Sequence, residues 1–340
     1  MGLSACVALV LERLGFPPFR PRAPWITGDL QTLRDTLRPL RSPPDSGLPI
    51  PIDVGRGDRL LALWDQPPSA EFLAVVVLLH GLGGSSGGVG LRRLGRVLQQ
   101  AGFAVLRLNL RGAGQGRPLA HGTYAASCNA DLAPVLQQAR QLAQGKPLLG
   151  MGFSLGGTIL LNGQLDPAFP RLDGLVCISS PLDLQACSRQ IERPRNQVYE
   201  GWLLKRLLDQ TLEPGLDRWV RTIRDFDAAI TAPRWGYGSV QEYYAKASPL
   251  PLLLSAGAAD SPGGPRLPPS LIVHALDDPW VPVAGAQRLA RAEVPGLEVL
   301  LTPRGGHNGF HAVGDHSGGI EGSWGDRLTA RWFRCLVGAA

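Results

Sequence analysis

The sequence predicts an α/β protein with a mostly parallel central sheet and helices on both faces. From about residue 50 onward, short apolar runs alternate with segments of helical spacing, as expected for strands joined by crossover helices. Only residues 183–254 interrupt this alternation, and they contain no apolar run typical of a buried strand. We therefore expect one domain with an N-terminal helical or extended segment (1–49), a core (50–182 and 255–340) and an insertion (183–254).

The strands are predicted from runs bounded by turn residues. Residues 59–64 form an early strand, and the wholly apolar run 73–79 is typical of a central strand buried on both faces. The same pattern recurs at residues 103–109, 147–152, 175–179, 270–275 and 296–301. Helical spacing predicts helices over residues 91–100, 129–143 and 283–292. The apolar run 5–11 is too short to span a bilayer and follows no basic region, so it is interpreted as a first helix.

The insertion has helical spacing at residues 201–210 and 216–226, and it is rich in aromatic residues around 234–244. Ligands of open α/β sheets bind at the carboxyl edge of the strands. We expect the insertion to lie above that edge as a helical lid. The glycine- and proline-rich residues 256–269 would then form a flexible return to the sheet.

Charge and cysteine usage narrow the possible partners. The net charge is +6, but the basic residues are dispersed and nearly all are arginine, which favours a solvated surface over a nucleic-acid interface. The five cysteines are widely spaced and form no C-x-x-C pair, which favours reduced thiols in the cytoplasm over disulfides or a zinc site.

A candidate nucleophile lies in the stretch Gly152-Phe153-Ser154-Leu155-Gly156. It follows the predicted strand 147–152 and begins a helical stretch, so it matches a strand–elbow–helix turn that exposes the serine hydroxyl of Ser154. The alternative is a serine that only caps the helix after a glycine turn.

A glycine-rich loop, His80-Gly81-Leu82-Gly83-Gly84, follows the predicted strand 73–79. Acyl transfer passes through a tetrahedral oxyanion that needs two N–H donors, and we expect the backbone N–H groups of Leu82 and Leu155 to supply them. A simple glycine turn or a phosphate-binding loop is the alternative. No P-loop or dinucleotide motif stands in a suitable place, so no cofactor is expected.

The acid and base candidates follow the last two predicted strands. Asp278 and Asp277 compete for the role of the acid, and the pattern Asp-Pro-apolar-Val-Pro favours Asp278. His307 lies in a glycine-rich loop, which completes the order Ser–Asp–His that is typical of α/β hydrolases. His307 and His311 are four residues apart, but the glycines around them disfavour a helical metal site. We expect structural or surface roles for the other histidines: His80, His121, His274, His311 and His316.

Together these segments resemble the YheT-like branch of the AB hydrolase superfamily along nearly the whole chain. The resemblance includes Pro24-Trp25-Ile26, residues 30–33, the loop 80–85, Asn109-Leu110-Arg111-Gly112, residues 224–227, 231–233, 236–238 and 243–244, and the loops 275–279 and 305–310. It implies an α/β-hydrolase fold and an acyl-ester hydrolase with a triad of Ser154, Asp278 and His307.

The expected function is hydrolysis of a small-molecule or lipid carboxylic ester through an acyl-enzyme. Acyltransfer or haloperoxidase-type chemistry on the same triad is one alternative. A lipid-binding protein that keeps the fold without catalysis is another. Weak association with a membrane surface is compatible with the sequence, which leaves the acyl chain, the head group and the oligomeric state open.

Overall fold

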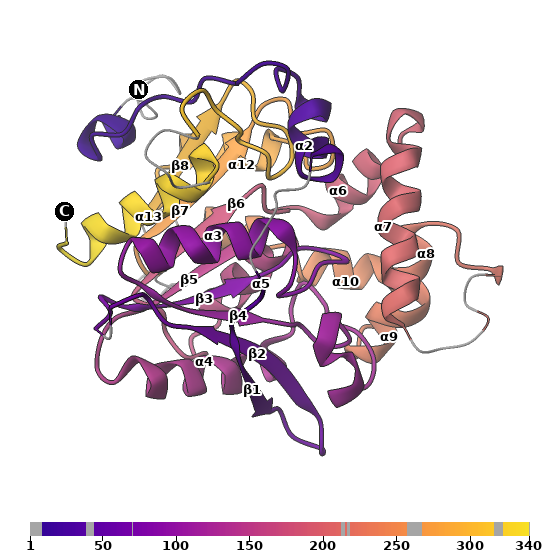
Figure 1. Cartoon of the computed structure of the whole chain (residues 1–340). Coiled ribbons are helices and arrows are strands. Elements are labelled where there is room, and N and C mark those ends of the chain that lie inside the picture. Colours follow the sequence, from indigo (N-terminus) through magenta and orange to yellow (C-terminus); the bar gives the residue numbers. More distant parts are fainter. Residues whose placement is uncertain are drawn as a thin grey trace.

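An eight-stranded sheet, in the order β1-β2-β4-β3-β5-β6-β7-β8, forms the centre of the computed structural model (Figure 1). The structure describes residues 9–38, 44–69, 71–211, 215, 218–256, 267–315 and 322–339. The strands are β1 (Leu48–Asp53), β2 (Arg59–Asp65), β3 (Val75–Leu79), β4 (Ala104–Leu108), β5 (Leu148–Phe153), β6 (Gly174–Ile178), β7 (Ser270–Ala275) and β8 (Leu297–Thr302). All pairings from β4 through β3 to β8 are parallel, which confirms the predicted fold class.

The edge strand β1 is one that the sequence pattern did not predict. It pairs antiparallel with β2, which in turn pairs antiparallel with β4. Its sequence contains Pro49 and Pro51, which disfavour a central strand because proline has no N–H group to donate. These prolines are two residues apart, so both missing N–H groups belong to the same side of the strand. An edge position tolerates this because one side of β1 has no neighbouring strand in the sheet order.

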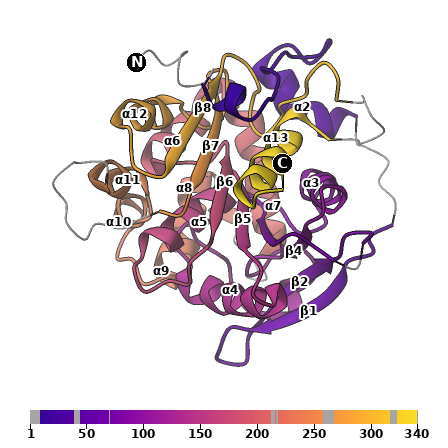
Figure 2. The ribbon, with the colours of Figure 1, turned by 90° about the vertical axis from the view of Figure 1, so that its left-hand side faces the viewer.

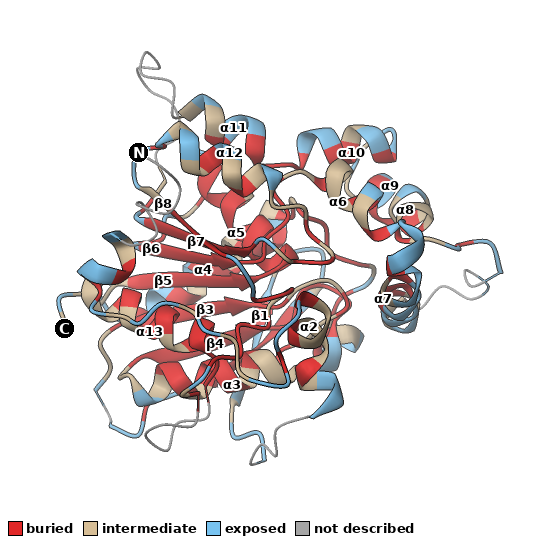
Figure 3. Ribbon diagram, turned by 90° about the horizontal axis from the view of Figure 1, so that it is seen from above, coloured by how far each residue is buried: buried red, intermediate tan, exposed pale blue. Residues whose placement is uncertain are grey.

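Two apolar layers cover the sheet because side chains of a strand alternate between its faces. In β3, Val75 and Val77 belong to the layer that includes α4 (Asn129–Ala143), α5 (Leu155–Leu165) and α12 (Ala284–Ala292), whereas Val76 belongs to the layer that includes α3 (Val89–Gln100) and α13 (Trp324–Leu336). Figure 2 shows these helices on opposite sides of the sheet. Figure 3 shows the sheet as the buried centre, with exposed residues on the outer surfaces of the helices. Helices α3, α4 and α12 confirm the predicted helical segments.

Helices connect β6 to β7. They are α6 (Leu184–Ile191), the 3-10 turn Pro194–Asn196, α7 (Gln197–Gln210), α8 (Ile223–Phe226), a π-helical turn Asp227–Thr231, α9 (Ala232–Arg234), α10 (Val240–Lys246) and α11 (Leu250–Ala256). Helices α6 to α10 gather at one end of the sheet (Figure 1), whereas α11 packs beside α12. Helix α7 confirms the predicted helix at 201–210. Within the described part of the chain, no helix is long and apolar enough to cross a membrane.

The predicted helix over 216–226 is wrong in its extent. The side chain of Thr222 accepts the Asp225 N–H and the Asp225 carboxylate accepts the Thr222 N–H, and this reciprocal cap starts α8 only at Ile223. Residues 216 and 217 lie outside the described residues. Of the predicted first helix (5–11), residues 9–11 are helical and the helix runs on to residue 13, while residues 5–8 lie outside the described part. Most of the predicted return segment, residues 257–266, also lies outside it.

Candidate active site

A cavity of about 400 Å³ lies at the carboxyl ends of the parallel strands, because residues that directly follow β3 and β5 line it. The helices between β6 and β7 form one wall, and α2 (Gly28–Leu37) forms another. The cavity wall includes four of the five predicted site residues: Leu82, Ser154, Leu155 and His307.

Ser154 stands at the sharp turn between β5 and α5, with φ 50° and ψ −125°. Such a backbone conformation is strained for a residue with a side chain, and it is a recurrent feature of functional sites. Close packing explains the flanking glycines, since a Cβ at Gly152 would lie 2.2 Å from the Gly157 nitrogen and one at Gly156 would lie 2.6 Å from the His80 carbonyl oxygen. The Ser154 side chain makes no capping hydrogen bond to α5, so a role as a helix cap does not explain it.

Asp278 and His307 form a buried pair. The His307 Nδ1 and Asp278 Oδ2 atoms are 2.9 Å apart, and the two side chains are 2% and 0% exposed. The other carboxylate oxygen of Asp278 accepts the backbone N–H groups of Trp280, at 2.8 Å, and Val281, at 3.0 Å. Burial raises the pKa of Asp278, but the His307 ring, the nearby His274 and the Val281 hydrogen bond outweigh burial and hold the pKa below its usual value. Asp278 is therefore ionised at neutral pH.

The neighbouring Asp277 has a different partner. Its Oδ1 accepts the backbone N–H of Gly306 at 2.9 Å. This hydrogen bond joins the loop that follows β7 to the loop that follows β8, and it does not involve the imidazole of His307. Burial, with a contribution from the nearby Asp278, raises the pKa of Asp277. Of the two competing aspartates, the structure places Asp278 against His307.

The remaining ring nitrogen of His307, Nε2, is buried and has no hydrogen-bond partner among the described residues. Trp280 packs its ring over His307, with ring centroids 4.5 Å apart and planes at 31°. If the ring proton is on Nδ1 and is donated in a hydrogen bond to the ionised Asp278, the Nε2 lone pair is available to a neighbouring hydroxyl. This proton position is inferred from the hydrogen bond.

The glycine loop after β3 is held in place by His80 and Tyr124. Burial lowers the pKa of His80 to about 4, so the ring is neutral, with Nδ1 2.8 Å from the Gly81 carbonyl oxygen and Nε2 accepting the Leu110 N–H. The Tyr124 hydroxyl accepts the Gly83 N–H at 2.8 Å and donates to the Gly81 carbonyl at 3.3 Å. Tyr124 is not among the predicted site residues, because no local pattern marks a tyrosine 41 residues away from its partner.

The helical insertion also contacts this loop. From α7, Arg206 donates to the Gly83 carbonyl at 2.8 Å and Gln210 donates to the Gly84 carbonyl at 3.0 Å. The loop is therefore bonded on both sides, by Tyr124 from the core and by α7 from the insertion.

Among the described residues, no other histidine is hydrogen-bonded to this pair, although His274 lies close enough for its charge to act on Asp278. His274 is buried, with Nε2 3.2 Å from the Val281 carbonyl oxygen. His311 lies beside Asp35 and Asp315, at 3.5 and 4.0 Å, and does not share a partner with His307. His121 is exposed, and His316 lies outside the described residues.

A family model described as the α/β hydrolase fold matches residues 74–312. The chain is 29% identical over 276 residues to the putative esterase YheT of Escherichia coli, covering 76% of this chain and 77% of that protein. It is 28% identical over 262 residues to phospholipase ABHD3 of Bos taurus, covering 73% of this chain and 59% of that protein. The chain thus spans less than two thirds of that relative's length.

Solved structures agree on the fold. A soluble variant of monoglyceride lipase from Saccharomyces cerevisiae has a TM-score of 0.54 at 18% identity, covering 87% of this chain and 98% of that chain. The esterase domain of a Rhodothermus marinus protein has a TM-score of 0.53 at 18% identity, covering 86% and 100%. The chain belongs to the α/β hydrolase superfamily, as a member of its YheT-like branch.

Proposed function

We propose that this protein is a serine hydrolase that cleaves carboxylic esters through an acyl-enzyme on Ser154. The single observation that carries the proposal is that Ser154, on its strained turn, and His307, paired with the buried Asp278, line the same cavity. A nucleophile, a base and a group that orients the base are the set that acyl transfer requires.

In the proposed mechanism, His307 Nε2 takes the hydroxyl proton of Ser154 as Oγ attacks the ester carbonyl carbon. The backbone N–H groups of Leu82 and Leu155 stabilise the oxyanion that forms, and each such donor contributes about 3 kcal/mol. The imidazolium, stabilised by Asp278, then protonates the leaving alkoxide. Water, deprotonated by His307, attacks the acyl-enzyme, which releases the acid and restores the Ser154 hydroxyl.

The apolar character of the cavity wall formed by the insertion supports the proposal that the substrate has an apolar acyl chain. It is lined by the aliphatic and aromatic side chains of Leu184, Ile191, Leu203, Leu207, Ile223 and Phe226. The named activities of the relatives, phospholipase and monoglyceride lipase, are compatible with such a chain. We therefore propose a small or lipid ester as substrate and a lid role for the insertion, residues 183–254.

A fluorophosphonate probe tests the proposal, because it forms a covalent bond to an activated serine as fluoride leaves. Wild type should be labelled, Ser154→Ala should not, and Ser255→Ala, which removes an exposed serine on α11, should be labelled at the wild-type rate. An unlabelled wild type, or labelling that survives Ser154→Ala, would refute the assignment.

Substrate assays separate ester hydrolysis from its alternatives. A series of p-nitrophenyl esters from acetate to palmitate, beside phospholipid and monoacylglycerol, should show hydrolysis that depends on Ser154. Product analysis with a competing alcohol distinguishes acyltransfer to that alcohol from transfer to water. Binding of lipid without turnover or labelling would instead indicate a non-catalytic lipid-binding protein.

A further inference from the structure

Helix α2 lies outside residues 74–312, which the family model matches, yet it packs against the loops of both Asp278 and His307. The contacts join backbone to backbone. A Cβ at Gly28 would lie 2.1 Å from the Asp277 carbonyl oxygen, one at Gly306 would lie 2.3 Å from the Gly28 carbonyl oxygen, and one at Gly309 would lie 2.6 Å from the Gln31 carbonyl oxygen. These approaches leave no room for side chains, so α2 and the histidine loop (residues 303–311) form one packed unit.

Thr32 makes the most direct bond between α2 and the histidine loop. Its Oγ1 accepts the backbone N–H of His307 at 2.8 Å. The same hydroxyl donates its proton to the Gly28 carbonyl at 2.7 Å, one turn earlier in α2. Because the hydroxyl proton is used within the helix, the oxygen faces His307 as an acceptor.

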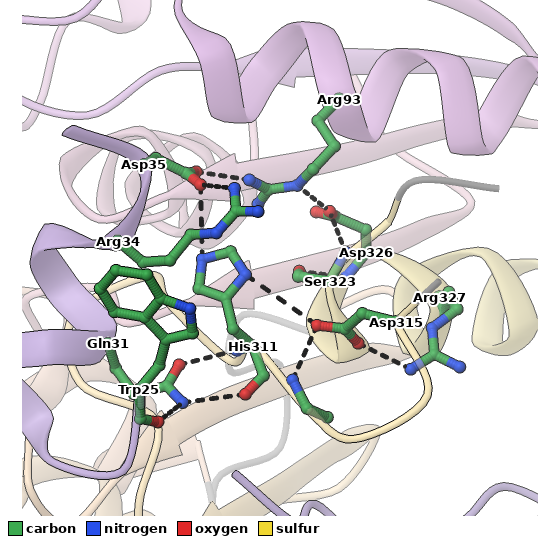
Figure 4. Close-up of polar contacts among 11 residues, drawn as sticks. Trp25, Gln31, Arg34, Asp35, Arg93, His311, Asp315, Ser323, Asp326 and Arg327 are labelled. Atoms are coloured by element: carbon green, nitrogen blue, oxygen red, sulfur yellow. Dashed lines mark hydrogen bonds and ion pairs between the residues drawn. The ribbon is translucent and has the colours of Figure 1, made fainter. Parts of the chain in front are cut away.

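Gln31 binds the same loop four residues further on. Its Oε1 accepts the His311 N–H at 2.7 Å, and its Nε2 donates to the His311 carbonyl at 2.9 Å and to the Trp25 carbonyl at 2.5 Å (Figure 4). Gln31 is 1% exposed. The Gln31 amide therefore accepts from and donates to the backbone of the same residue, as paired strands do. These bonds hold the histidine loop at His311.

An ionic cluster, buried except for the partly exposed Asp35, anchors α2 itself (Figure 4). Asp35 on α2 pairs with Arg34 at 2.8 Å and with Arg93 on α3, and Arg93 pairs in turn with Asp326 on α13 at 2.5 Å. His311 lies 3.5 Å from Asp35. The support for the histidine loop is therefore fixed to two core helices.

From these contacts we propose that α2 is part of the active site and that Thr32 is a positioning residue for His307. This inference rests on the proposed function. The histidine loop contains Gly305, Gly306 and Gly309, so its backbone has more conformational freedom than most. The Thr32 acceptor fixes the N–H of the catalytic base itself, and through it the point from which the imidazole extends towards Ser154. A displacement of about 1 Å at a reacting group can lower a rate about 100-fold.

The test compares Thr32→Val, which keeps the shape but loses the acceptor, with Thr32→Ser, which keeps it. Thr329→Val is a matched control, because Thr329 makes the same type of bond to a carbonyl one turn earlier, 2.8 Å to Gly325 in α13. Thr32→Val should lower kcat for a p-nitrophenyl ester about 10- to 100-fold with KM within about 3-fold. Thr32→Ser and Thr329→Val should keep kcat within about 3-fold of wild type.

Hydrogen exchange of the wild-type peptide covering residues 303–311 gives a second measurement that needs no variant to fold. The His307 amide should be protected in wild type, and unprotected exchange there would overturn the inference. A kcat for Thr32→Val within about 2-fold of wild type, or an equal loss in Thr32→Ser, would also overturn it. If one of these outcomes is found while the fluorophosphonate probe still labels Ser154 in wild type, the inference fails but the proposed function stands. If the wild type is not labelled, the proposed function fails and this inference fails with it.

Discussion

If the proposed mechanism holds, Asp278→Asn should abolish ester hydrolysis by reversing the tautomer of His307. Asp278 Oδ1 accepts two backbone N–H groups, at 2.8 and 3.0 Å, so the amide oxygen of asparagine must occupy that position. The amide NH2 group is then directed at His307 Nδ1, where Asp278 Oδ2 lies at 2.9 Å in wild type. An NH2 donor there requires Nδ1 to accept, which places the ring proton on Nε2. That nitrogen can no longer take the Ser154 proton.

The expected loss in kcat is about 10⁴-fold, as for the same substitution in the Ser-His-Asp triad of serine proteases. This corresponds to about 5.5 kcal/mol of transition-state stabilisation. Turning the amide over would restore the tautomer, but it would leave the two backbone N–H donors and the amide NH2 group without acceptors. Each such buried, unsatisfied group costs about 1–3 kcal/mol, so the flipped amide is disfavoured.

Hydrolysis of a p-nitrophenyl ester gives kcat at saturating substrate and kcat/KM at dilute substrate, so kcat and KM are obtained separately. Asp277→Asn is the matched control, since its oxygen can still accept the Gly306 N–H and no charge next to the imidazole is lost. The raised pKa of Asp277 shows that the fold disfavours its charge. This variant should keep kcat within about 3-fold of wild type. Equal losses in the two variants, or more than a tenth of wild-type kcat in Asp278→Asn, would refute the reasoning.

Three further predictions concern stability. Gly156→Ala should prevent accumulation of folded protein, because the added Cβ would lie 2.6 Å from two backbone carbonyl oxygens. Its control is Gly201→Ala in α7, where the added Cβ meets open space; this variant should raise the free energy of unfolding in urea by about 0.5–1 kcal/mol. Arg93→Met should lower that free energy by about 3–5 kcal/mol, because it leaves the buried Asp326 carboxylate without its cation and Asp35 with Arg34 alone; an unchanged Tm would contradict this. Acidification from pH 6.5 to 4 should destabilise the protein, because burial lowers the pKa of His80 to about 4 and of His311 to about 3, so only the unfolded state takes up these protons. Each ring contributes about 3 kcal/mol or more, and Asp227, whose pKa burial raises to about 6, offsets part of the loss; stability that is flat or rises over this range in urea titrations would contradict the prediction.

Most of the core could be predicted from the sequence, because buried strands and their turns have local patterns. The apolar run before Ser154 and the glycines around it predict the strand–elbow–helix, and the structure has β5, the strained serine and α5 at that place. The order of the loops that carry Ser154, Asp278 and His307 was also visible. By contrast, β1 was hidden by its prolines, and the start of α8 depended on a reciprocal cap rather than on periodicity.

The fold class and the loops that contain the candidate nucleophile, acid and base follow from local sequence patterns, because periodicity and turn chemistry act between near neighbours. Which aspartate contacts His307, and which groups hold the two loops in place, depends on the packing of the whole chain. Thr32 and His307 are 275 residues apart, and Tyr124 and Gly83 are 41 apart. A hydrogen bond across such a distance depends on how the sheet and its helices pack, so neither of its partners is marked by its local sequence.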